Sequence, residues 1–494
     1  MTTPTAPGRT LPAATTTSPP RARRRWLGPL LLRLHFYAGV FVGPFIVVAA
    51  ISGGLYALTP QIERVVYAHE LTAASPDAAA LPLADQVVAA REHVGQGETL
   101  VAVRPAPEPG ATTRVMFAGT DLGPSETRAV FVDPGTAEVR GELTTYGTSG
   151  ALPLRTWIDQ LHRSLHLGDP GRLYSELAAS WLGIIALSGL AMWVVQFRRT
   201  RRRRDMLRPG TGRTPYARTR SRHLAVGIWV MAGALFLSAT GITWSQHGGA
   251  NVTDLRGALG WSTPAVSTAL DGGGDGAGDE HAGHTTAVTP GVSSGTYAPG
   301  AFDSVLSVAQ EVNVNTGLVE IRPPAEPGTA WVVQEIQRSY PTEVDAVAID
   351  GTTMQVTDRV DFAEFGLIAK LARWGIDLHM GSMFGLPHQI VLFVLASGIV
   401  SMVVWGYTMW WQRRPTRTQH RPGAPPARGV LRQVPWWGAV AVIAVAAAVG
   451  LFLPLLGVTL AAFLLVDLLL AWVARRRDSS RRRASPARAD AHGA

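Results

Sequence analysis

The chain has 494 residues, of which 47% are hydrophobic and 16% are charged, and its formal net charge is +9. It has 15 tryptophans and no cysteine. The lack of cysteine excludes disulfides, thiolate-bound zinc or iron–sulfur sites, thiol catalysis and c-type haem attachment. Long apolar runs alternate with polar stretches of domain length, which indicates a membrane protein with sizeable soluble parts.

Six apolar segments are long enough to cross a hydrocarbon layer of about 30 Å. They are residues 34–58, 173–197, 222–245, 387–411, 436–453 and 455–474. The last two are separated only by Leu453-Pro454, so we expect a tight helical hairpin over 436–474. The first segment is longer than the apolar part of a signal peptide and has no small-residue cleavage pattern, so we interpret it as a retained helix.

The arginines predict the orientation. Residues 1–34, 198–222, 412–435 and 475–494 together carry 30 arginines and 3 acidic residues, whereas 59–172 and 246–386 carry 15 basic and 31 acidic residues. Because positive loops stay in the cytoplasm, we expect a multi-pass protein of the inner (cytoplasmic) membrane with both termini cytoplasmic. The basic residues therefore indicate topology and contact with anionic membrane lipid, and no nucleic-acid partner is expected.

The predicted organisation follows in chain order. It is a cytoplasmic basic tail 1–33, a helix 34–58, an outer segment 59–172, a helix 173–197, an arginine-rich cytoplasmic loop 198–221, a helix 222–245, an outer segment 246–386, a helix 387–411, a cytoplasmic loop 412–435, the hairpin 436–474 and a cytoplasmic basic tail 475–494.

Each outer segment reads as a small α+β domain. A helical pattern is followed by alternating strand patterns and a closing Asp-containing turn. The predicted helices are 83–93 and 302–312, and the predicted strands are 100–103, 114–118, 129–132, 318–321, 330–336 and 344–349. Between the domains, residues 271–284 are rich in Gly, Asp and His and are expected to form a disordered tether, in which His281 and His284 offer at most a transient metal site.

The sequence also contains an internal repeat. From His35 and from His223, glycines follow at +4 and +18. From His162 and from His379, glycines follow at +6 and +27 and a tryptophan at +31. The repeating unit is a helix, an outer segment, a His-bearing lead-in and a second helix, and both copies run in the same direction.

Two parallel repeats imply a pseudo-twofold axis along the membrane normal. This axis places His35 opposite His223 at the cytoplasmic end of a four-helix bundle, and His162 opposite His379 at its outer end. The predicted fold is therefore a membrane α-helical bundle of six helices, with a four-helix pseudo-twofold core and a C-terminal hairpin, that carries two small α+β extracytoplasmic domains.

Paired histidines at both ends of a bundle suit haem, whose iron takes axial ligands on opposite faces. We expect two non-covalent haem b groups, each with two histidine ligands. Small residues would leave room for the flat rings: Gly39, Gly43, Gly53, Gly189, Gly227, Gly241 and Gly406. Arg163 and Arg172 are candidates for neutralising propionates, although anchoring in lipid explains them equally well. Any one of the histidines, taken alone, is more often structural in a membrane protein.

Three residues are weaker candidates. His166 aligns with Met383 in the other repeat, and His388 has no counterpart. Asp467 is an acid inside the last apolar segment, which makes it a candidate for proton or quinol handling. A hydrogen-bonded structural role near the inner interface is equally compatible with its position.

Four stretches of the chain resemble the PepSY-associated transmembrane family. They are 34–44 (LHFYAGVFVGP), 161–172 (LHRSLHLGDPGR), 378–387 (LHMGSMFGLP) and 405–415 (WGYTMWWQRRP). The resemblance spans most of residues 30–415 and implies that the outer domains are PepSY-like. It places the family's histidines on His35, His162, His223 and His379, and it leaves the hairpin 436–474 outside the shared pattern.

Some members of this family resemble haem-containing reductases of ferric siderophores. The resemblance implies a transmembrane di-haem protein that passes electrons to an extracytoplasmic ferric chelate or siderophore during iron uptake. No flavin- or nicotinamide-binding motif is apparent, so the electron donor is expected to be quinol or a cytoplasmic reductase. The acidic outer segments favour a cationic or neutral chelate.

Two other functions remain open at this stage. The outer domains are also compatible with a regulatory role that restrains an extracytoplasmic protease, although this leaves the paired histidines unexplained. The bundle is also compatible with a metal-transport function, although few polar residues lie at mid-depth, where a hydrated cation path would need them.

Overall fold

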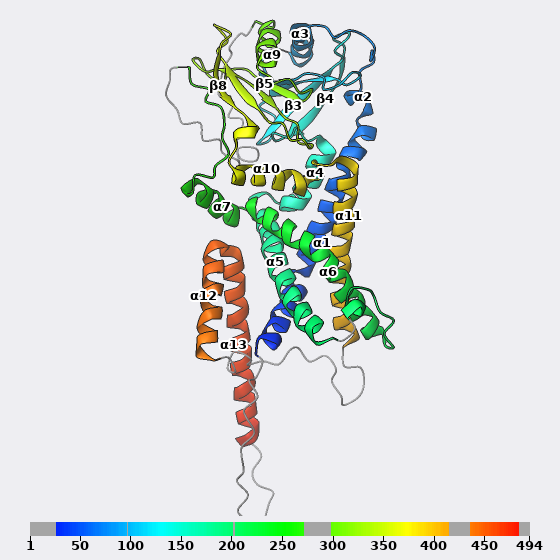
Figure 1. Cartoon of the computed structure of the whole chain (residues 1–494), viewed down its shortest axis with the longest axis vertical. Coiled ribbons are helices and arrows are strands. Elements are labelled where there is room, and N and C mark those ends of the chain that lie inside the picture. Colours follow the sequence, from blue (N-terminus) through cyan, green and yellow to red (C-terminus); the bar gives the residue numbers. More distant parts are fainter. Residues whose placement is uncertain (1–25, 96, 201–202, 271–297, 414–434, 484–494) are drawn as a thin grey trace, which may run out of the picture.

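The computed structural model describes residues 26–95, 97–200, 203–270, 298–413 and 435–483. The predicted tether, with His281 and His284, lies outside the described residues. A β-sheet stands on one end of a long helical bundle (Figure 1). We call this end of the bundle the sheet end and the opposite end the far end.

Four of the described helices have the length and hydropathy of membrane spans: α1 (Leu27–Val66), α5 (Gly168–Arg199), α6 (Pro215–Thr243) and α11 (Gly385–Gln412). Both α1 and α6 pack against α5 and against α11. The helices therefore form a ring in which α1 and α6 face each other across one diagonal. Because α1 and α6 begin the two repeats, this diagonal relates equivalent elements. The helical membrane bundle is confirmed at this level, and α1 continues beyond both ends of the predicted segment 34–58.

The C-terminal apolar region forms two helices, α12 (Trp436–Phe452) and α13 (Pro454–Arg483). The break falls at Leu453-Pro454, where proline begins a new helix because it has no N–H to continue the old one. The hairpin packs against the outside of the ring at α5, where Trp181 Nε1 donates a hydrogen bond of 3.0 Å to Thr459 Oγ1. α12 and the apolar part of α13 are shorter than the four long spans.

The outer segments build one antiparallel sheet. Its strands are β1 (Thr99–Arg104), β2 (Thr113–Ala118), β3 (Glu126–Val132), β4 (Val139–Tyr146), β5 (Val319–Arg322), β6 (Trp331–Glu335), β7 (Ala346–Ile349) and β8 (Val356–Val360). Their order is β4-β3-β2-β1-β5-β6-β7-β8. The two halves join where Val103 pairs with Ile321. The two predicted α+β units are therefore not separate domains, and each contributes four strands where the sequence predicted three.

A single hydrophobic core supports this sheet. The helices α3 (Leu83–Val94) and α9 (Ala301–Glu311) cover one face, and side chains of both halves, such as Val87 and Phe302, belong to the same buried cluster. The Asp303 carboxylate accepts hydrogen bonds from the Leu83 and Ala84 N–H groups, at 2.7 and 2.9 Å. An acid from one half thus caps the first turn of the helix in the other half.

Short helices connect the sheet to the bundle. The lead-in helices are α4 (Pro153–Ser164) and α10 (Leu367–Met380), and they lie between the sheet and the spanning helices (Figure 1). The remaining elements are α2 (Ala68–Leu71), η1 (Arg203–Met206), α7 (His247–Ala258) and η2 (Phe362–Glu364). The buried Glu176 on α5 accepts hydrogen bonds from the first N–H groups of α7, at His247 and Gly248.

Candidate functional site

Two histidines meet at the sheet end of the bundle. His162 on α4 and His379 on α10 have ring centres 6.4 Å apart. Both helices end within two residues of their histidine, and the next residues, Leu165 and Gly381, have left-handed backbone conformations. The chain therefore turns from each histidine into the next spanning helix. Burial lowers the pKa of His162, and burial together with the nearby His162 lowers the pKa of His379 to about 3, so both rings are neutral.

The second pair lies toward the far end. His35 on α1 and His223 on α6 have ring centres 6.2 Å apart, with their planes at 89°. Because α1 and α6 are diagonal helices, this pair crosses the middle of the ring. The structure thus brings the four histidines together in the two pairs that the repeat predicts.

Hydroxyl groups at equivalent positions orient the sheet-end pair. Ser52 Oγ lies 3.1 Å from His162 Nδ1, and Thr240 Oγ1 lies 2.6 Å from His379 Nδ1. Each hydroxyl donates its own hydrogen to the carbonyl four residues earlier in its helix. The oxygen can then accept only from the ring, so Nδ1–H is the donor in both histidines.

The far-end pair has only one such hydroxyl. His35 Nδ1 donates to the Ile185 carbonyl at 3.0 Å and lies 3.2 Å from Ser188 Oγ. The position equivalent to Ser188 in the second repeat is Trp405, which has no hydroxyl to offer His223. The surroundings of the two far-end rings therefore differ, whereas each sheet-end ring has a hydroxyl at the equivalent position.

The hydrogen bonds fix a tautomer. In the described part of the chain, the hydrogen bonds of His35, His162 and His379 all use Nδ1. A neutral imidazole with its proton on Nδ1 keeps the lone pair of Nε2 for a metal ion. This arrangement, with the second ring nitrogen held by a carbonyl or hydroxyl, is typical of histidines that ligate metals.

Two glycines allow close approach to the histidines. A Cβ atom at Gly53 would lie 3.0 Å from His162 Cε1, and a Cβ atom at Gly189 would lie 3.2 Å from His35 Cε1. A larger residue at either position would push the ring away. At Gly39 and Gly406, by contrast, a Cβ atom would meet no described atom within 4 Å. Gly43 and Gly227 pack instead against other side chains, Val403 and Met402. Only part of the predicted set of small residues therefore adjoins the histidines.

The weaker histidine candidates lie away from the pairs. The His166 side chain is exposed and its ring packs 5.0 Å from Trp157. His388 lies in the first turn of α11, and its ring centre is 5.9 Å from that of Phe384. Neither ring is paired with another histidine in the described structure.

The two arginines proposed for propionates have protein partners. Arg163 Nη2 donates to the Tyr146 hydroxyl at 2.6 Å, and its guanidinium lies over the Tyr146 ring. Arg172 Nη2 donates to the Trp244 carbonyl at 3.3 Å. Both are therefore held at the sheet end of the bundle, with part of their donor capacity in use.

Asp467 of α13 makes an ion pair with the buried Arg33 of α1. The Arg33 guanidinium also lies over the Tyr37 ring, which contacts Phe463 of α13. These contacts attach the C-terminal hairpin to the first spanning helix. The geometry favours a structural role for Asp467.

Within the described ranges, no three or more His, Asp or Glu side chains gather in a cluster suited to a metal ion. The histidine pairs are two-residue sites, which suit a metal whose other ligands come from a planar ring. The donors fit haem in three respects: both sheet-end rings are neutral, three of the four histidines carry the proton on Nδ1, and each pair faces its partner inside a helical bundle.

A cavity of about 920 Å³ lies between the sheet and the bundle, next to the sheet-end pair. Its walls come from α1, α4, β1, β2 and the connection that follows β6. Sequence reasoning missed this cavity because its arginines are scattered along the chain, at Arg64, Arg104, Arg114, Arg155 and Arg338. It also missed Ser52 and Thr240, although both stand 17 residues after an aligned histidine.

Comparison with known proteins agrees with the motifs. Residues 32–413 match the family described as the PepSY-associated TM region. No curated protein matches the chain. The matched region includes both histidine pairs and the whole sheet, and it ends before the hairpin α12–α13. The chain therefore belongs to the family of the PepSY-associated TM region.

Proposed function

We propose that the protein is a transmembrane electron-transfer protein with two non-covalent haem b groups, which reduces ferric chelates or siderophores outside the cytoplasmic membrane for iron uptake. His162 and His379 hold one group, and His35 and His223 hold the other. When bound, the two groups supply one-electron carriers at the two ends of the bundle. The donor is quinol or a cytoplasmic reductase.

The separation of the paired rings carries this proposal. A metal–nitrogen bond measures about 2 Å, so two rings that would share one metal, each through a ring nitrogen, would have their centres about 6 Å apart. The observed separations are 6.2 and 6.4 Å. The spacing of both pairs, which lie on different helices, is compatible with a metal held between the two rings.

The chain's own residues prepare these sites. Ser52 and Thr240 hold the Nδ1–H groups of the sheet-end rings, and Ser188 does the same for His35. Near the far-end pair in sequence, Ala38 and Ala225 are buried. Histidines held by hydrogen bonds reorganise less when the charge of a bound group changes.

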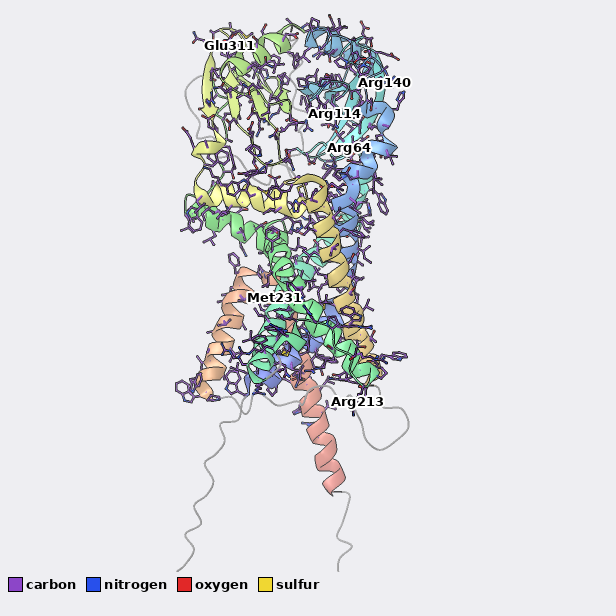
Figure 2. The ribbon with its side chains drawn as sticks, turned by 45° about the vertical axis from the view of Figure 1, so that its right-hand side comes forward. Arg64, Arg114, Arg140, Arg213, Met231 and Glu311 are labelled. Atoms are coloured by element: carbon purple, nitrogen blue, oxygen red, sulfur yellow. The ribbon has the colours of Figure 1, made fainter. Side chains whose placement is uncertain are left out.

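The direction of transfer rests on the arginine distribution. The far end carries Arg213, whereas Arg64, Arg114 and Arg140 belong to the sheet end (Figure 2). The arginine excess of the far-end segments favours the cytoplasm. We therefore assign the sheet and its cavity to the extracytoplasmic side, where a ferric chelate arrives.

The activity can be tested in membranes that contain the protein. With a physiological donor, reduction of an external ferric chelate is followed by a ferrous indicator. We expect His379→Ala to abolish the reduction and His388→Ala to retain it. If His379→Ala reduces the chelate as fast as the unmodified protein, the proposed function is wrong.

A second reductant distinguishes the two ends. Dithionite added from outside reaches the sheet end directly. After subtraction of the direct chemical reaction, His35→Ala should still support reduction of the chelate, and His379→Ala should not. Equal rates for the two variants would contradict the assignment of the sheet end as the exit site.

A further inference from the structure

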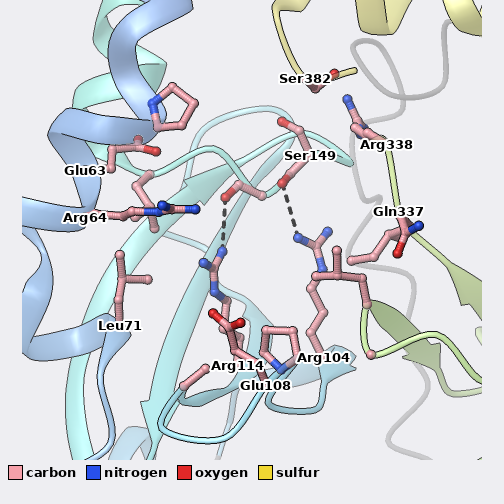
Figure 3. Close-up of a pocket in the computed structure, with 18 of the residues that line it drawn as sticks. Glu63, Arg64, Leu71, Arg104, Glu108, Arg114, Ser149, Gln337, Arg338 and Ser382 are labelled. Carbon is pink, nitrogen blue, oxygen red and sulfur yellow. Dashed lines mark hydrogen bonds between the residues drawn. The ribbon is translucent and has the colours of Figure 1, made fainter. Parts of the chain in front are cut away.

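The cavity at the sheet end is basic, because five arginines and only two glutamates, Glu63 and Glu108, line it. Arg64, Arg104, Arg114 and Arg338 extend toward the same space (Figure 3). Arg155 of α4 also lines this cavity. These residues come from α1, both halves of the sheet and a lead-in helix, so the cluster exists only because the two halves share one sheet.

Some of this charge is neutralised. Arg104 pairs with Glu320 at 2.6 Å and donates to the Thr148 carbonyl at 2.8 Å. Arg155 pairs with the buried Glu63 at 2.7 Å. These two guanidinium groups are structural, because their carboxylate partners and the neighbouring backbone occupy them.

Arg114 and Arg338 are different. Within the described residues, neither makes an ion pair with a carboxylate at 4.0 Å or less. Arg114 donates to the Gly150 carbonyl at a long 3.5 Å, and Arg338 has a 3.6 Å contact to the Met380 sulfur. The Arg114 guanidinium also lies over the Phe131 ring. Both side chains are partly buried, so two positive charges stand in the cavity wall without a carboxylate in direct contact, although Glu63 and Asp377 act on them from a greater distance.

The pKa values of Arg114 and Arg338 agree with the lack of a carboxylate in direct contact. Burial, followed by repulsion from Arg104 and Arg155, lowers the pKa of Arg114 to about 10. Burial, followed by repulsion from Arg373, lowers the pKa of Arg338 to about 10. Both guanidinium groups remain charged at neutral pH, but the protein destabilises the charged form. A bound anion would stabilise the charged form and raise both pKa values.

The size of the cavity limits the ligand. Pockets of about 300 to 1,000 Å³ hold small organic molecules, and about 920 Å³ is far more than one phosphate or sulfate needs. Several separated arginines favour a ligand with several oxyanion groups, because each guanidinium binds a carboxylate through two parallel N–H donors.

The cavity also adjoins the sheet-end histidines. Its lining includes Tyr56, which stands four residues, or about 6 Å, beyond Ser52 along α1. It also includes Met380, the residue after His379. A molecule in the cavity therefore lies at the sheet end of the histidine pair, on the side away from the bundle.

We propose that this cavity binds a small polycarboxylate, and specifically a negatively charged ferric polycarboxylate complex, through Arg114 and Arg338. The binding of the polycarboxylate stands on the cavity alone, whereas its role as the substrate rests on the proposed function. The net acidic charge of the outer segments favoured a cationic or neutral chelate. Inside the cavity the local charge has the opposite sign, and the local charge decides what binds there.

Binding is tested by calorimetry with the purified full-length protein, loaded with haem. The probes are citrate, ferric citrate, inorganic phosphate and a cationic ferric hydroxamate. We expect citrate and ferric citrate to bind and the hydroxamate not to bind. Inorganic phosphate should bind at least tenfold more weakly than citrate. Affinity for citrate should fall as the salt concentration rises.

Substitutions locate the site. Arg114→Gln and Arg338→Gln should each weaken citrate binding by roughly 10- to 100-fold, the range for a charge-assisted hydrogen bond. The control is Arg359→Gln, an arginine of β8 that pairs with Asp361 at 2.7 Å and does not line the cavity. It should leave the affinity unchanged. Arg64 is exposed on the rim, so Arg64→Gln tests the site without disturbing the buried cluster.

Three results would overturn the proposal. They are unchanged citrate affinity in folded Arg338→Gln and Arg64→Gln proteins, stronger binding of the cationic chelate, and citrate binding that occurs only in haem-free protein. The last result would mean that the arginines hold haem propionates. Because binding is measured without electron transfer, a protein that binds citrate but reduces no ferric chelate would contradict the proposed function and leave the anion site standing.

Discussion

Ser52 and Thr240 occupy the same position in the two repeats, and each accepts a hydrogen bond from the Nδ1–H of a sheet-end histidine, at 3.1 and 2.6 Å. The repeated hydroxyl shows that the two halves of the bundle hold their histidines in the same way. The hydroxyls orient the rings without any ligand, so their contribution can be tested by substituting them while the histidines stay in place.

Thr240→Val removes the acceptor but keeps the size and shape of the side chain. We expect haem at the sheet end to dissociate roughly tenfold more readily, because the groups that hydrogen-bond metal-binding histidines contribute about that much to metal affinity. The control is Thr243→Val, since the Thr243 hydroxyl bonds only within its own helix. The measurement is haem transfer to an excess of apomyoglobin. Equal transfer from both variants would contradict a positioning role for Thr240.

The ion pair between Arg33 and Asp467 should be structural. Breaking a buried pair leaves one charge uncompensated and costs about 3 kcal/mol, so we expect Asp467→Asn to lower the melting temperature of the protein in detergent. Haem content and chelate reduction should stay unchanged. If a folded Asp467→Asn protein keeps its haem but loses reduction, Asp467 has the proton or quinol role instead.

Asp133 links the start of the outer segment to the sheet. Although its burial alone would raise the pKa, hydrogen bonds from the Ser75 hydroxyl and from the Ala74, Ser75 and Gly135 N–H groups lower the pKa of Asp133 below its ordinary value. A folded pKa below the unfolded one gives stability above the unfolded value of about 3.9, and this stability is lost as pH falls through the lower folded pKa.

Asp133→Asn should therefore destabilise the sheet at pH 7, by about 2 kcal/mol. The difference in unfolding free energy between the variant and the unmodified protein should shrink below a pH of about 4. Thermal unfolding at several pH values measures this difference. At the equivalent turn, the Asp350 carboxylate accepts hydrogen bonds from the Thr352 N–H and the Thr353 hydroxyl, two donors against the four of Asp133 among the described residues, so Asp350→Asn should have a smaller effect. A pH-independent effect of Asp133→Asn would argue against the carboxylate as the cause.

The orientation in the membrane is open to direct labelling. The chain has no cysteine, so a single introduced one is the only thiol. In intact cells, Ser125→Cys, in the turn before β3, should react with an impermeant thiol reagent. Thr211→Cys, before α6, should react only after the membrane is opened. Labelling of Thr211→Cys in intact cells would reverse the assigned orientation.

Much of the bundle could be predicted from the sequence, because apolar runs and a repeated His–Gly spacing are local signals. The pairing of the four histidines followed from the repeat alone. Ser52 and Thr240 carried the same signal, since both follow an aligned histidine by 17 residues, but hydroxyls are too common in helices to stand out without the structure.

The sheet was harder to predict. β8 is an edge strand whose residues are exposed or only partly buried, and β4 contains Gly141, so neither shows the apolar alternation that marks a strand. The pairing of Val103 with Ile321 joins residues far apart in sequence and leaves no local trace. The arginine cavity depends on this join, because Arg114 and Arg338 come from opposite halves.

The central claim is that each histidine pair holds one haem, and the haem-to-protein ratio of purified single variants tests it most directly. The unmodified protein should bind two haems per chain and show a split low-spin absorption band. His162→Ala and His379→Ala should each leave one haem, and His35→Ala and His223→Ala should each leave the other, with a distinct spectrum. The controls His166→Ala and His388→Ala should keep both. A protein that binds no haem, or a His166→Ala protein that alone empties the sheet-end site, would contradict the account.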